Sequence, residues 1–461
     1  MSTRNLCSEC IKKQEEIYRL REENKKLKAK LRLQERKITE GYFGSSTPSS
    51  KKPIKENSPN TVQKNRGGAK MGHKGNGRRS ISLEQADRIE EVKVECRCPR
   101  CQSADLKYLD QRERTVINFE LKKVRAVYKL ERKQCKTCGN VVQAKAPGVL
   151  PRNLYGNKLL AHVAVEHYVD GIRLGHLERQ TGVNMGSLIK GMHQLGRILI
   201  DVPTKLIEDY RQAPVKHADE TGWRNDGQNG YSWMFGSKDT AIFRFRPSRS
   251  GKVANEVFGK EQLPGVLVID RYRGYNKAPC HIQYCYAHLL RDVQDLEKEF
   301  PDKEEVKTFV QTTAPLLSRA MNLRSLPLSN DEFYRRAAKT KEEIIKIMNS
   351  EANHFGVQRI QNIFRENSHR LYHWADNREI PAENNFAERA LRPLVIARKV
   401  SFGSHSDAGA KTREILTTVL RTLKLRTNDV KTEFVNFLDR YAENPNIDIY
   451  ECLFNNELLN T

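Results

Sequence analysis

The sequence predicts an α/β core that contains a helical insertion. From about residue 213, apolar runs of strand length follow one another, and the run GVLVI at 265–269 has no polar side chain before Asp270. A charged helical pattern then covers about 289–378, and a further helix that carries acids follows it. Strands, a long helical segment and one more helix in this order are typical of an α/β domain with an insertion.

The strands of this core follow from the apolar pattern. The first of them is expected to end at Asp219. We place the core at 209–430 and expect a C-terminal tail at 431–461. The expected strands are 213–219, 231–236, 241–245, 265–270 and 282–288.

The net charge indicates a polyanionic partner. The 461 residues include 81 Lys and Arg against 57 Asp and Glu, which gives a formal net charge of +24. Nucleic acid is the first expectation, because neutralising phosphates releases counterions. Ribosome-associated and membrane-surface proteins have similar charge. At about 150 residues per domain, roughly three domains are expected.

The sequence contains no apolar run of about 18 residues, as a membrane-spanning helix would need. The N-terminal MSTRNLCSEC lacks the apolar stretch of a secretory signal. We therefore expect a cytoplasmic protein without a membrane partner. In that compartment the 10 Cys are expected to be metal ligands or free thiols.

Residues 1–40 predict a leucine-zipper-like helix. A single Asn in the apolar seam of such a helix favours a two-stranded coiled coil, and hence a homo-oligomer. Because Lys13 and Gln34 interrupt the seam, a charged surface helix is the alternative. The seam residues, at alternating three- and four-residue spacing, are Ile17, Leu20, Asn24, Leu27 and Leu31.

Residues 41–80 predict a basic, disordered linker, because they are rich in Ser, Pro, Gly, Lys and Arg and have almost nothing to bury. The Gly- and Arg-rich end of this linker suits a path along phosphates or in a minor groove, or a solvated tether. Upstream, Cys7 and Cys10 have no second pair nearby. They are expected to be free thiols, or a weak metal site shared across a dimer.

Residues 81–147 predict a zinc ribbon that binds DNA. Two CxxC pairs, with strand-like sequence between them, supply four thiolates for one tetrahedral Zn²⁺, and Gly139 follows the second pair as a tight turn requires. Cys96 is a spare that has poorer spacing than Cys98. The expected zinc ligands are Cys98, Cys101, Cys135 and Cys138.

Residues 148–208 predict a helical domain that contains a helix-turn-helix-like segment. In LGHLERQTGVNMGSLIKGM a short helix is followed by a turn at Gly182 and a second helix that is capped near Asn184. The second helix is the expected reader of the DNA groove. A plain helical bundle is the alternative.

Three acids have settings that indicate catalysis. Asp219 and Asp270 each follow an apolar strand, and Glu388 lies on an expected helix. Carboxylates at strand ends beside a helix converge at one edge of a sheet, where they repel one another unless a cation binds. Two Mg²⁺ or Mn²⁺ ions about 3.5–4 Å apart suit an in-line phosphoryl displacement.

Side-chain alternation separates the neighbours Asp219 and Glu220. On a strand, Val215, His217 and Asp219 share one face, and Glu220 belongs to the other. We therefore assign Asp219 to the site and expect Glu220 to cap the turn or to pair with a basic residue. The alternatives to a catalytic role are that Asp219 only forms a turn and that Glu388 only pairs with the neighbouring arginines 389 and 392.

The motifs HADETGWR, VIDRYRGYN, CYAHLLRD and NNFAERALRPLVIARK resemble those of the insertion sequence 66 family of transposases. The resemblance covers nearly the whole chain, the zipper, linker and zinc finger included. It implies a ribonuclease H-like core with a DDE triad, here Asp219, Asp270 and Glu388, and metal-dependent cleavage and joining of double-stranded DNA at element ends and target. It also implies a prokaryotic, nucleoid-associated protein that works as a multimer, with possible helper proteins of the same element.

Three departures from the family pattern bear on the site. Arg271 stands where many members have Gly, and Leu290 stands where Arg is usual. Glu383 stands where Asp is common, which makes it a second candidate for the third acid. No triad acid is lost, although the geometry around Asp270 is in question.

Other polar residues give weaker signals. We expect Arg389, Arg392 and Lys399 to contact DNA phosphates, although such a helix face is often only solvated. His288 suits either the metal site or a strand end. The tryptophans 223 and 233 are expected in the core. A non-catalytic DNA-binding relative and a metal-dependent nuclease of the same fold are the alternative functions.

Overall fold

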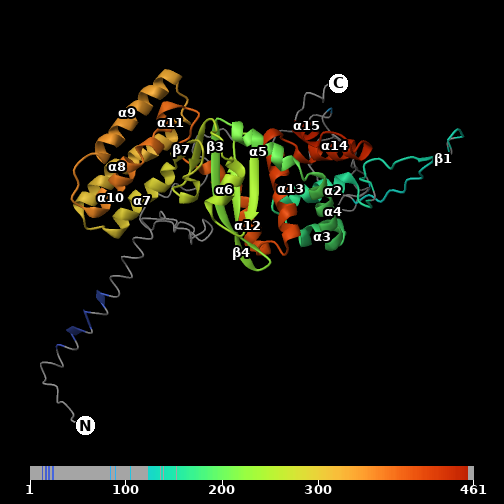
Figure 1. Cartoon of the computed structure of the whole chain (residues 1–461), viewed down its shortest axis with the longest axis horizontal. Helices are drawn as coiled ribbons and strands as arrows, with labels where there is room; N and C mark the ends of the chain where they lie inside the picture. Colours follow the sequence, from blue (N-terminus) through green and yellow to red (C-terminus); the bar gives the residue numbers. More distant parts are fainter. Residues whose placement is uncertain are drawn as a thin grey trace, which may run out of the picture. The chain divides into compact units, whose positions relative to one another are not determined.

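The computed structural model describes residues 123–454 except 135, 139 and 152, together with ten single positions nearer the N-terminus. The chain forms two compact units, one made of Met1–Lys52 with Leu130–Thr461 and the other of Pro53–Lys129. In the second unit, residues 123–129 are exposed and have no regular secondary structure. The fold and the site described below belong to the first unit (Figure 1).

A five-stranded mixed sheet forms the centre of the first unit, in the order β5-β4-β3-β6-β7. The middle strand β3 pairs antiparallel with β4 and parallel with β6. The outer pairs are antiparallel for β4 with β5 and parallel for β6 with β7. The strands are β3 (Val215–Asn225), β4 (Gln228–Gly236), β5 (Ala241–Arg246), β6 (Val266–Ile269) and β7 (His281–Tyr284).

The local sequence explains these strands. All four residues of β6 are buried, as an uninterrupted apolar run in a central parallel strand should be. Strands β3 and β4 are joined through Asp226 and Gly227, which have φ angles of 48° and 72°. Tight hairpins require this left-handed backbone, and Asp-Gly is a favoured pair for it.

The ends of two strands differ from the prediction by four residues or more. Strand β3 does not end at Asp219 but continues to Asn225, because its pairing with β4 extends to Asn225 opposite Gln228. Only its pairing with β6 stops early, at His217 opposite Val268. Strand β7 ends at Tyr284, and α7 begins at Tyr286. His288 therefore lies in the first turn of a helix and not at the end of a strand.

Both faces of the sheet are covered. On the Asp219 face, α12 (Asn385–Ser401) packs Leu391 and Leu394 against Trp223, Met234 and Phe243. The opposite face packs against α5 (Val202–Gln212) and α6 (Gly251–Phe258) in the largest apolar cluster, which also contains Trp233. The two tryptophans are thus core residues, as the sequence predicts.

Helix α13 (Asp407–Arg426) protects the edge strand β5. Thr422 and Thr418 accept hydrogen bonds from the backbone N–H groups of Ala241 and Phe243, at 3.1 and 3.0 Å. Glu414 accepts one from Phe245 N–H at 3.0 Å. Side-chain acceptors thereby satisfy donors that an edge strand would otherwise expose.

Five α-helices follow β7 and precede α12 in the sequence, and they lie at the other edge of the sheet (Figure 1). They occupy the region of the predicted insertion, and the first begins three residues earlier than 289. They are α7 (Tyr286–Glu299), α8 (Glu304–Leu323), α9 (Asn330–Met348), α10 (Phe355–Glu366) and α11 (His373–Asp376).

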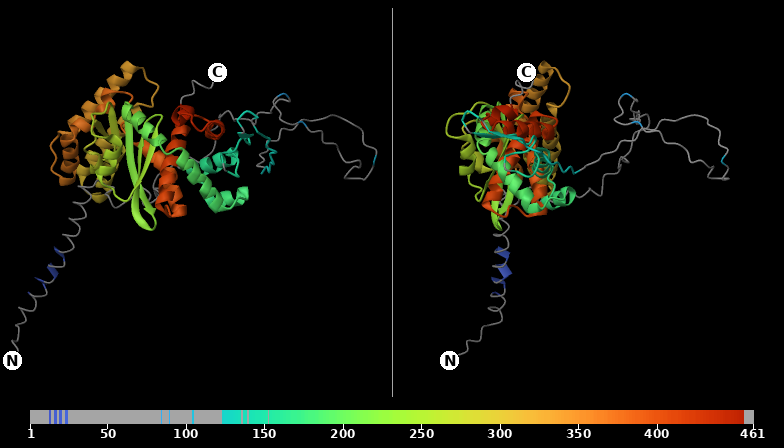
Figure 2. Two further views of the ribbon diagram at one scale, coloured as in Figure 1. Left: turned by 45° about the vertical axis from the view of Figure 1, so that its right-hand side comes forward. Right: turned by 90° about the vertical axis from the view of Figure 1, so that its right-hand side faces the viewer.

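The helices that precede the sheet pack with those that end the chain (Figure 2). Asn157 donates to Asp439 at 2.7 Å, and Lys431 pairs with Glu166 at 2.5 Å. The segment after 430, expected as a tail, is therefore helical and packed as far as Phe454. These helices are α2 (Asn157–Tyr168), α3 (Leu174–Thr181), α4 (Met185–Ile198), α14 (Val430–Glu443) and α15 (Ile449–Phe454).

Helices α3 and α4 have the predicted turn. Gly182 ends α3 with a left-handed φ of 61°, and the Asn184 side chain caps α4 by accepting from Gly186 N–H at 2.9 Å. In the N-terminal segment, Ile17, Leu20 and Asn24 are helical, whereas Leu27, Leu31 and the linker at 41–80 lie outside the described residues. The coiled coil and the linker stay predictions.

Among the described residues, no helix has the length and apolar character needed to cross a membrane.

Candidate active site

Asp219 and Asp270 lie at the same level on neighbouring strands. Val215 is opposite Val266 and His217 is opposite Val268, so two further residues bring Asp219 level with Asp270. Because side chains alternate along a strand, both carboxyl groups leave the sheet on the same face. Both side chains are partly buried.

Asn384 fixes the start of α12 against this face. Its side chain bonds His217 Nδ1 at 2.8 Å and donates to the carbonyl oxygen of Ala218 at 2.9 Å. Its backbone N–H donates to Cys285 Sγ at 3.2 Å, and its carbonyl oxygen accepts from Glu388 N–H at 3.3 Å. Asn384 thus bonds β3 through its side chain. Through its backbone it bonds the start of α7 and the first turn of α12, where Glu388 lies.

The carboxylates act on one another electrostatically. Burial raises the pKa of Asp219 well above its usual value, and the charges of Glu220, Asp270 and Glu388 raise it further. Burial, and then the Glu220 charge, raises the pKa of Asp270 to about 7. The N–H of Tyr272, which donates to Asp270 at 2.9 Å, opposes this shift in pKa. Like charges in a desolvated site are the pattern that a bound cation relieves.

Glu220 points to the opposite face, as alternation predicts. It is buried, accepts from Arg249 Nε at 2.8 Å and accepts from the Tyr275 hydroxyl at 2.6 Å. The expectation that Glu220 pairs with a basic residue is confirmed. With its own charge compensated, Glu220 still raises the pKa of both aspartates.

Glu388 faces Arg291 of α7 at 3.5 Å, and each side chain is about a third exposed, at 33% and 31%. The ion pair therefore crosses between helices and does not join Glu388 to the arginines of its own helix. Within residues 123–454 and the other described positions, no three His, Cys, Asp or Glu side chains are grouped closely enough to hold one metal ion.

The donor chemistry nevertheless suits a hard divalent cation. Asp219 and Asp270 present only carboxylate oxygens, and their mutual repulsion, together with burial, disfavours the charge that a cation would stabilise. Glu388 would complete the set after leaving Arg291. The residues thus fit the ion in type, and Glu388, the candidate for the third ligand, is paired with Arg291.

Glu383 is less well placed as the third acid. Burial raises its pKa, while the charges of Arg324 and Arg389 lower it. The charge of Glu388, in contrast, acts on Asp219. Glu388 therefore shares the electrostatic environment of the aspartates, and Glu383 shares that of two arginines.

The departures near Asp270 have structural roles. Arg271 forms an ion pair with the buried Asp292 of α7, and its charge lowers the pKa of Asp270. Leu290 is partly buried and packs against the main apolar cluster. Arg271 thus ties the end of β6 to α7, the helix that also carries Arg291.

The exposed face of α12 continues from Glu388 as a basic stripe. Arg392 and Lys399 follow Glu388 by four and eleven residues, which at about 3.6 residues per turn returns each to nearly the same face. Both are exposed, as is Arg389. The three predicted DNA contacts are therefore accessible.

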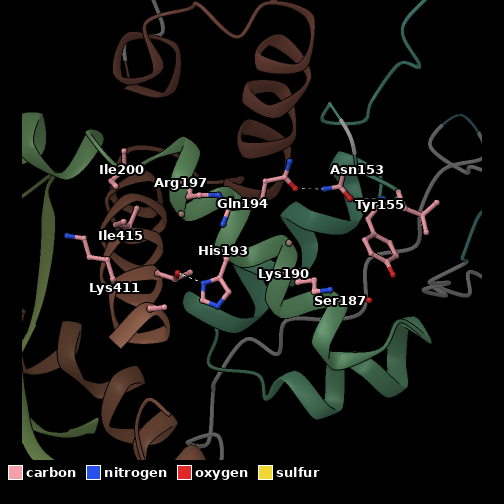
Figure 3. A pocket seen from close by; sticks show the side chains of 15 residues that line it. Asn153, Tyr155, Ser187, Lys190, His193, Gln194, Arg197, Ile200, Lys411 and Ile415 are labelled. Carbon is pink, nitrogen blue, oxygen red and sulfur yellow. Dashed lines mark hydrogen bonds between the residues drawn. The ribbon is translucent and has the colours of Figure 1, made fainter. Parts of the chain in front are cut away.

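A second basic surface lies between α4 and α13. Figure 3 shows a pocket of about 660 Å³ that Lys190, Arg197 and Lys411 line together with His193 and Gln194. None of its lining residues is acidic. The polar face of α4, predicted to read a DNA groove, thus forms one wall of a hollow.

The predicted zinc ribbon is described only in part. Strands β1 (Arg132–Gln134) and β2 (Val141–Gln143) form an antiparallel hairpin, and Cys138 is exposed in its turn. Cys98, Cys101 and Cys135 lie outside the described residues. The hairpin is of the kind that presents a CxxC pair, and zinc binding stays a prediction.

Three positioning residues were missed from sequence. Asn384 precedes a helix and therefore resembles an ordinary cap, although its side chain bonds β3 instead. Arg291 and Arg249 gave no local signal, because each acts on a carboxylate that is distant in sequence.

Comparison with known proteins agrees with this architecture. A family model described as "Transposase IS66 family" matches residues 152–412, which is more than half of the chain and includes all three acids. A protein of Sinorhizobium fredii (strain NBRC 101917 / NGR234), named "Uncharacterized protein y4qI", is 23% identical over 350 residues. That match covers 66% of this chain and 63% of the Sinorhizobium protein. The chain therefore belongs to the IS66 family of transposases.

Proposed function

We propose that this transposase binds the terminal inverted repeats of its element and catalyses metal-dependent strand cleavage and strand transfer. The sheet supports a ribonuclease H-like core, because its strands stand in the order third, second, first, fourth and fifth and only the second runs antiparallel to the rest. The observation that carries the proposal is the level placement of Asp219 and Asp270 beside the first turn of α12.

In this proposal Asp219, Asp270 and Glu388 are the catalytic residues that hold Mg²⁺ or Mn²⁺. Two such ions supply activation of a water or 3′-hydroxyl and stabilisation of the leaving oxygen. The protein supplies the carboxylates at fixed positions, and Asn384 orients the helix that brings Glu388. Glu388 would have to leave its ion pair with Arg291 in order to bind the metal.

DNA would approach along the basic surfaces. Arg389, Arg392 and Lys399 lie on the helix that carries Glu388, so phosphates that contact them are directed towards the acids. The pocket between α4 and α13 offers a further set of cations to the backbone. Binding to both surfaces would orient the DNA before any chemistry.

The remaining parts are proposed on sequence grounds. One Zn²⁺ on Cys98, Cys101, Cys135 and Cys138 would order a DNA-binding ribbon, and the helix at 1–40 would join protomers. Helper proteins of the same element are possible further partners. Metal analysis should find about one zinc per chain, and the double variant Cys98→Ser/Cys135→Ser should lose it.

The test of the catalytic proposal is a supercoiled-donor assay with Mg²⁺ or Mn²⁺. Asp219→Asn, Asp270→Asn and Glu388→Gln should each reduce cleavage and joining by at least about a hundredfold, while Glu379→Gln, an exposed acid outside the site, should not. Wild-type rates in any of the three site variants would show that the assignment of that acid is wrong.

The products separate the alternatives. Strand-transfer joints support the transposase, whereas hydrolysis without joints would identify a nuclease. Specific binding without metal-dependent nicking would identify a non-catalytic DNA-binding relative.

A further inference from the structure

Phe402 combines two unfavourable features. It ends α12 in a left-handed conformation, with a φ of 60°, which non-glycine residues rarely adopt. Its side chain is also 75% exposed, although it is a large aromatic. Strained and exposed residues persist where the surrounding structure imposes them, and they gather at ligand sites.

The loop after Phe402 is held firmly by the β3–β4 hairpin. Ser404 N–H donates to the Arg224 carbonyl, and Asp226 N–H donates to the Ser404 carbonyl, both at 2.9 Å. Trp223 Nε1 donates to the Ser404 hydroxyl at 3.1 Å. The backbone on the C-terminal side of Phe402 is therefore fixed, and the exposure of its ring does not result from a loose loop.

A pocket of about 430 Å³ opens beside Phe402. Ser401 and Gly403, the residues on both sides of Phe402, line it, as do Met185 and Ile189 of α4, whereas Phe402 itself is not among the lining residues. Its volume lies within the range of about 300–1,000 Å³ that is usual for small-ligand sites. An apolar wall and backbone close to the opening suit a flat, partly polar ligand.

The inner wall of this pocket is polar and preformed. Arg413 lies over the rings of Tyr168 and Trp223, each at 5.2 Å, and approaches His167 Nε2 at 2.8 Å. Burial, and then the Arg413 charge, lowers the pKa of His167 to about 3, so its ring is neutral and accepts this hydrogen bond. Contacts among its own residues thus fix the guanidinium and the rings of this wall, and none of the lining residues is acidic.

The pocket lies at the far end of the basic stripe. Phe402 follows Glu388 by 14 residues of helix, which is about 20 Å, and Arg392 and Lys399 lie between them. A DNA backbone that follows this stripe from the acids would pass the opening of the pocket.

We propose that this pocket binds one nucleobase that has left the DNA stack, and that the Phe402 ring occupies the space it leaves. The inference rests on the proposed function only in taking DNA as the ligand. Inserted apolar side chains and extrahelical pockets together offset the cost of unstacking. Phe402 presents an exposed ring from a backbone that is held by the hydrogen bonds of Ser404, as such a wedge requires.

The experiment compares two duplexes of one sequence, one fully paired and one with a single central unpaired 2-aminopurine. Binding of the full chain is measured by anisotropy without added Mg²⁺ or Mn²⁺, so that cleavage plays no part. Wild type should prefer the bulged duplex about tenfold and change the 2-aminopurine fluorescence, since an unpaired base enters the pocket without the cost of breaking a base pair.

Phe402→Ala should reduce this preference to about one, and Phe402→Tyr should restore it. Val400→Trp should also remove the preference, because Val400 lines the pocket and the larger side chain would fill part of it. Leu326→Ala, an exposed apolar residue far from the pocket in sequence, is the matched control and should keep the preference.

Equal affinity of wild type for both duplexes, or an unchanged preference in Phe402→Ala, would overturn the inference. Because no Mg²⁺ or Mn²⁺ is added, a protein that fails to cut DNA can still pass this test. Loss of catalysis and loss of base binding are thus separate results.

Discussion

Asp219 and Asp270 are carboxylic acids whose surroundings oppose their ionisation. They are brought together by strand register, desolvated by burial and exposed to the charge of Glu220. Repulsion among these carboxylates lowers the stability of the metal-free protein, and a bound cation would relieve that repulsion. The residues most suited to metal binding are therefore expected to destabilise the metal-free protein.

Asp270→Asn should stabilise the metal-free protein above neutral pH. The pKa of Asp270 rises from 3.8 to about 7 on folding, so the folded state binds the proton more tightly and this residue makes stability fall as pH rises through that window. The gain in unfolding free energy should be about 1–3 kcal/mol at pH 8 and smaller at pH 5.5. Urea unfolding at both pH values measures it, and a gain of equal size at both would contradict this origin.

Asn384→Ala should lower both stability and activity. The substitution leaves the buried Ala218 carbonyl without its side-chain donor and frees the first turn of α12 from β3. We expect a loss of about 1–3 kcal/mol in unfolding free energy. Asn385→Ala, at the exposed neighbouring position, is the control. If Asn384→Ala cleaves DNA as fast as the control, Asn384 does not position Glu388.

At the scale of elements, α12 joins the site to its surroundings. Its first turn carries Glu388, its apolar face packs on β3 and β4, and its outer face carries the basic stripe towards Phe402. Helix α7 opposes it, because Arg291 of α7 holds Glu388 and Asp292 of α7 holds Arg271. Glu388 and the arginine that pairs with it therefore lie on two different helices.

The double variant Arg392→Ala/Lys399→Ala should weaken DNA binding and its salt dependence. If each side chain neutralises one phosphate, the slope of log K against log salt should fall by about 1.8. Arg336→Ala/Lys339→Ala removes two exposed cations from α9 and serves as the control. Filter binding over a series of salt concentrations gives the slopes of both double variants. Equal slopes would show that Arg392 and Lys399 of α12 do not contact DNA phosphates.

The sequence predicted those elements whose pattern is local. The apolar run of β6 and the capped α4 have signals within a few residues. The end of β3 was wrong because the polar residues after Asp219 resemble a turn, whereas the partner strand β4 continues beside them. The ion pair of Glu388 and the contacts of Asn384 depend on segments about 100 residues or more away, and no local pattern specifies them.

At the scale of the whole molecule, the helices on both sides of the sheet belong to one apolar core. Leu160 of α2, Phe434 of α14 and Trp374 of α11 are members of the same buried cluster, which also includes Phe235 of the sheet. The sequence, in contrast, predicts a separate helical domain at 148–208. A continuous core implies that these regions unfold together, because no polar boundary divides them.

Phe434→Ala tests this cooperativity. Phe434 is fully buried, and its truncation should cost about 3–5 kcal/mol. The 3 Trp of the chain lie in the sheet and in α11, so tryptophan fluorescence reports regions distant in sequence from α14. If the core is one unit, the urea midpoint by fluorescence should fall as far as the midpoint by far-ultraviolet circular dichroism, and Asn436→Ala, at an exposed position of α14, should move neither. A fluorescence midpoint that stays at the wild-type value while the dichroism midpoint falls would show instead that the helices around α14 unfold as a domain of their own.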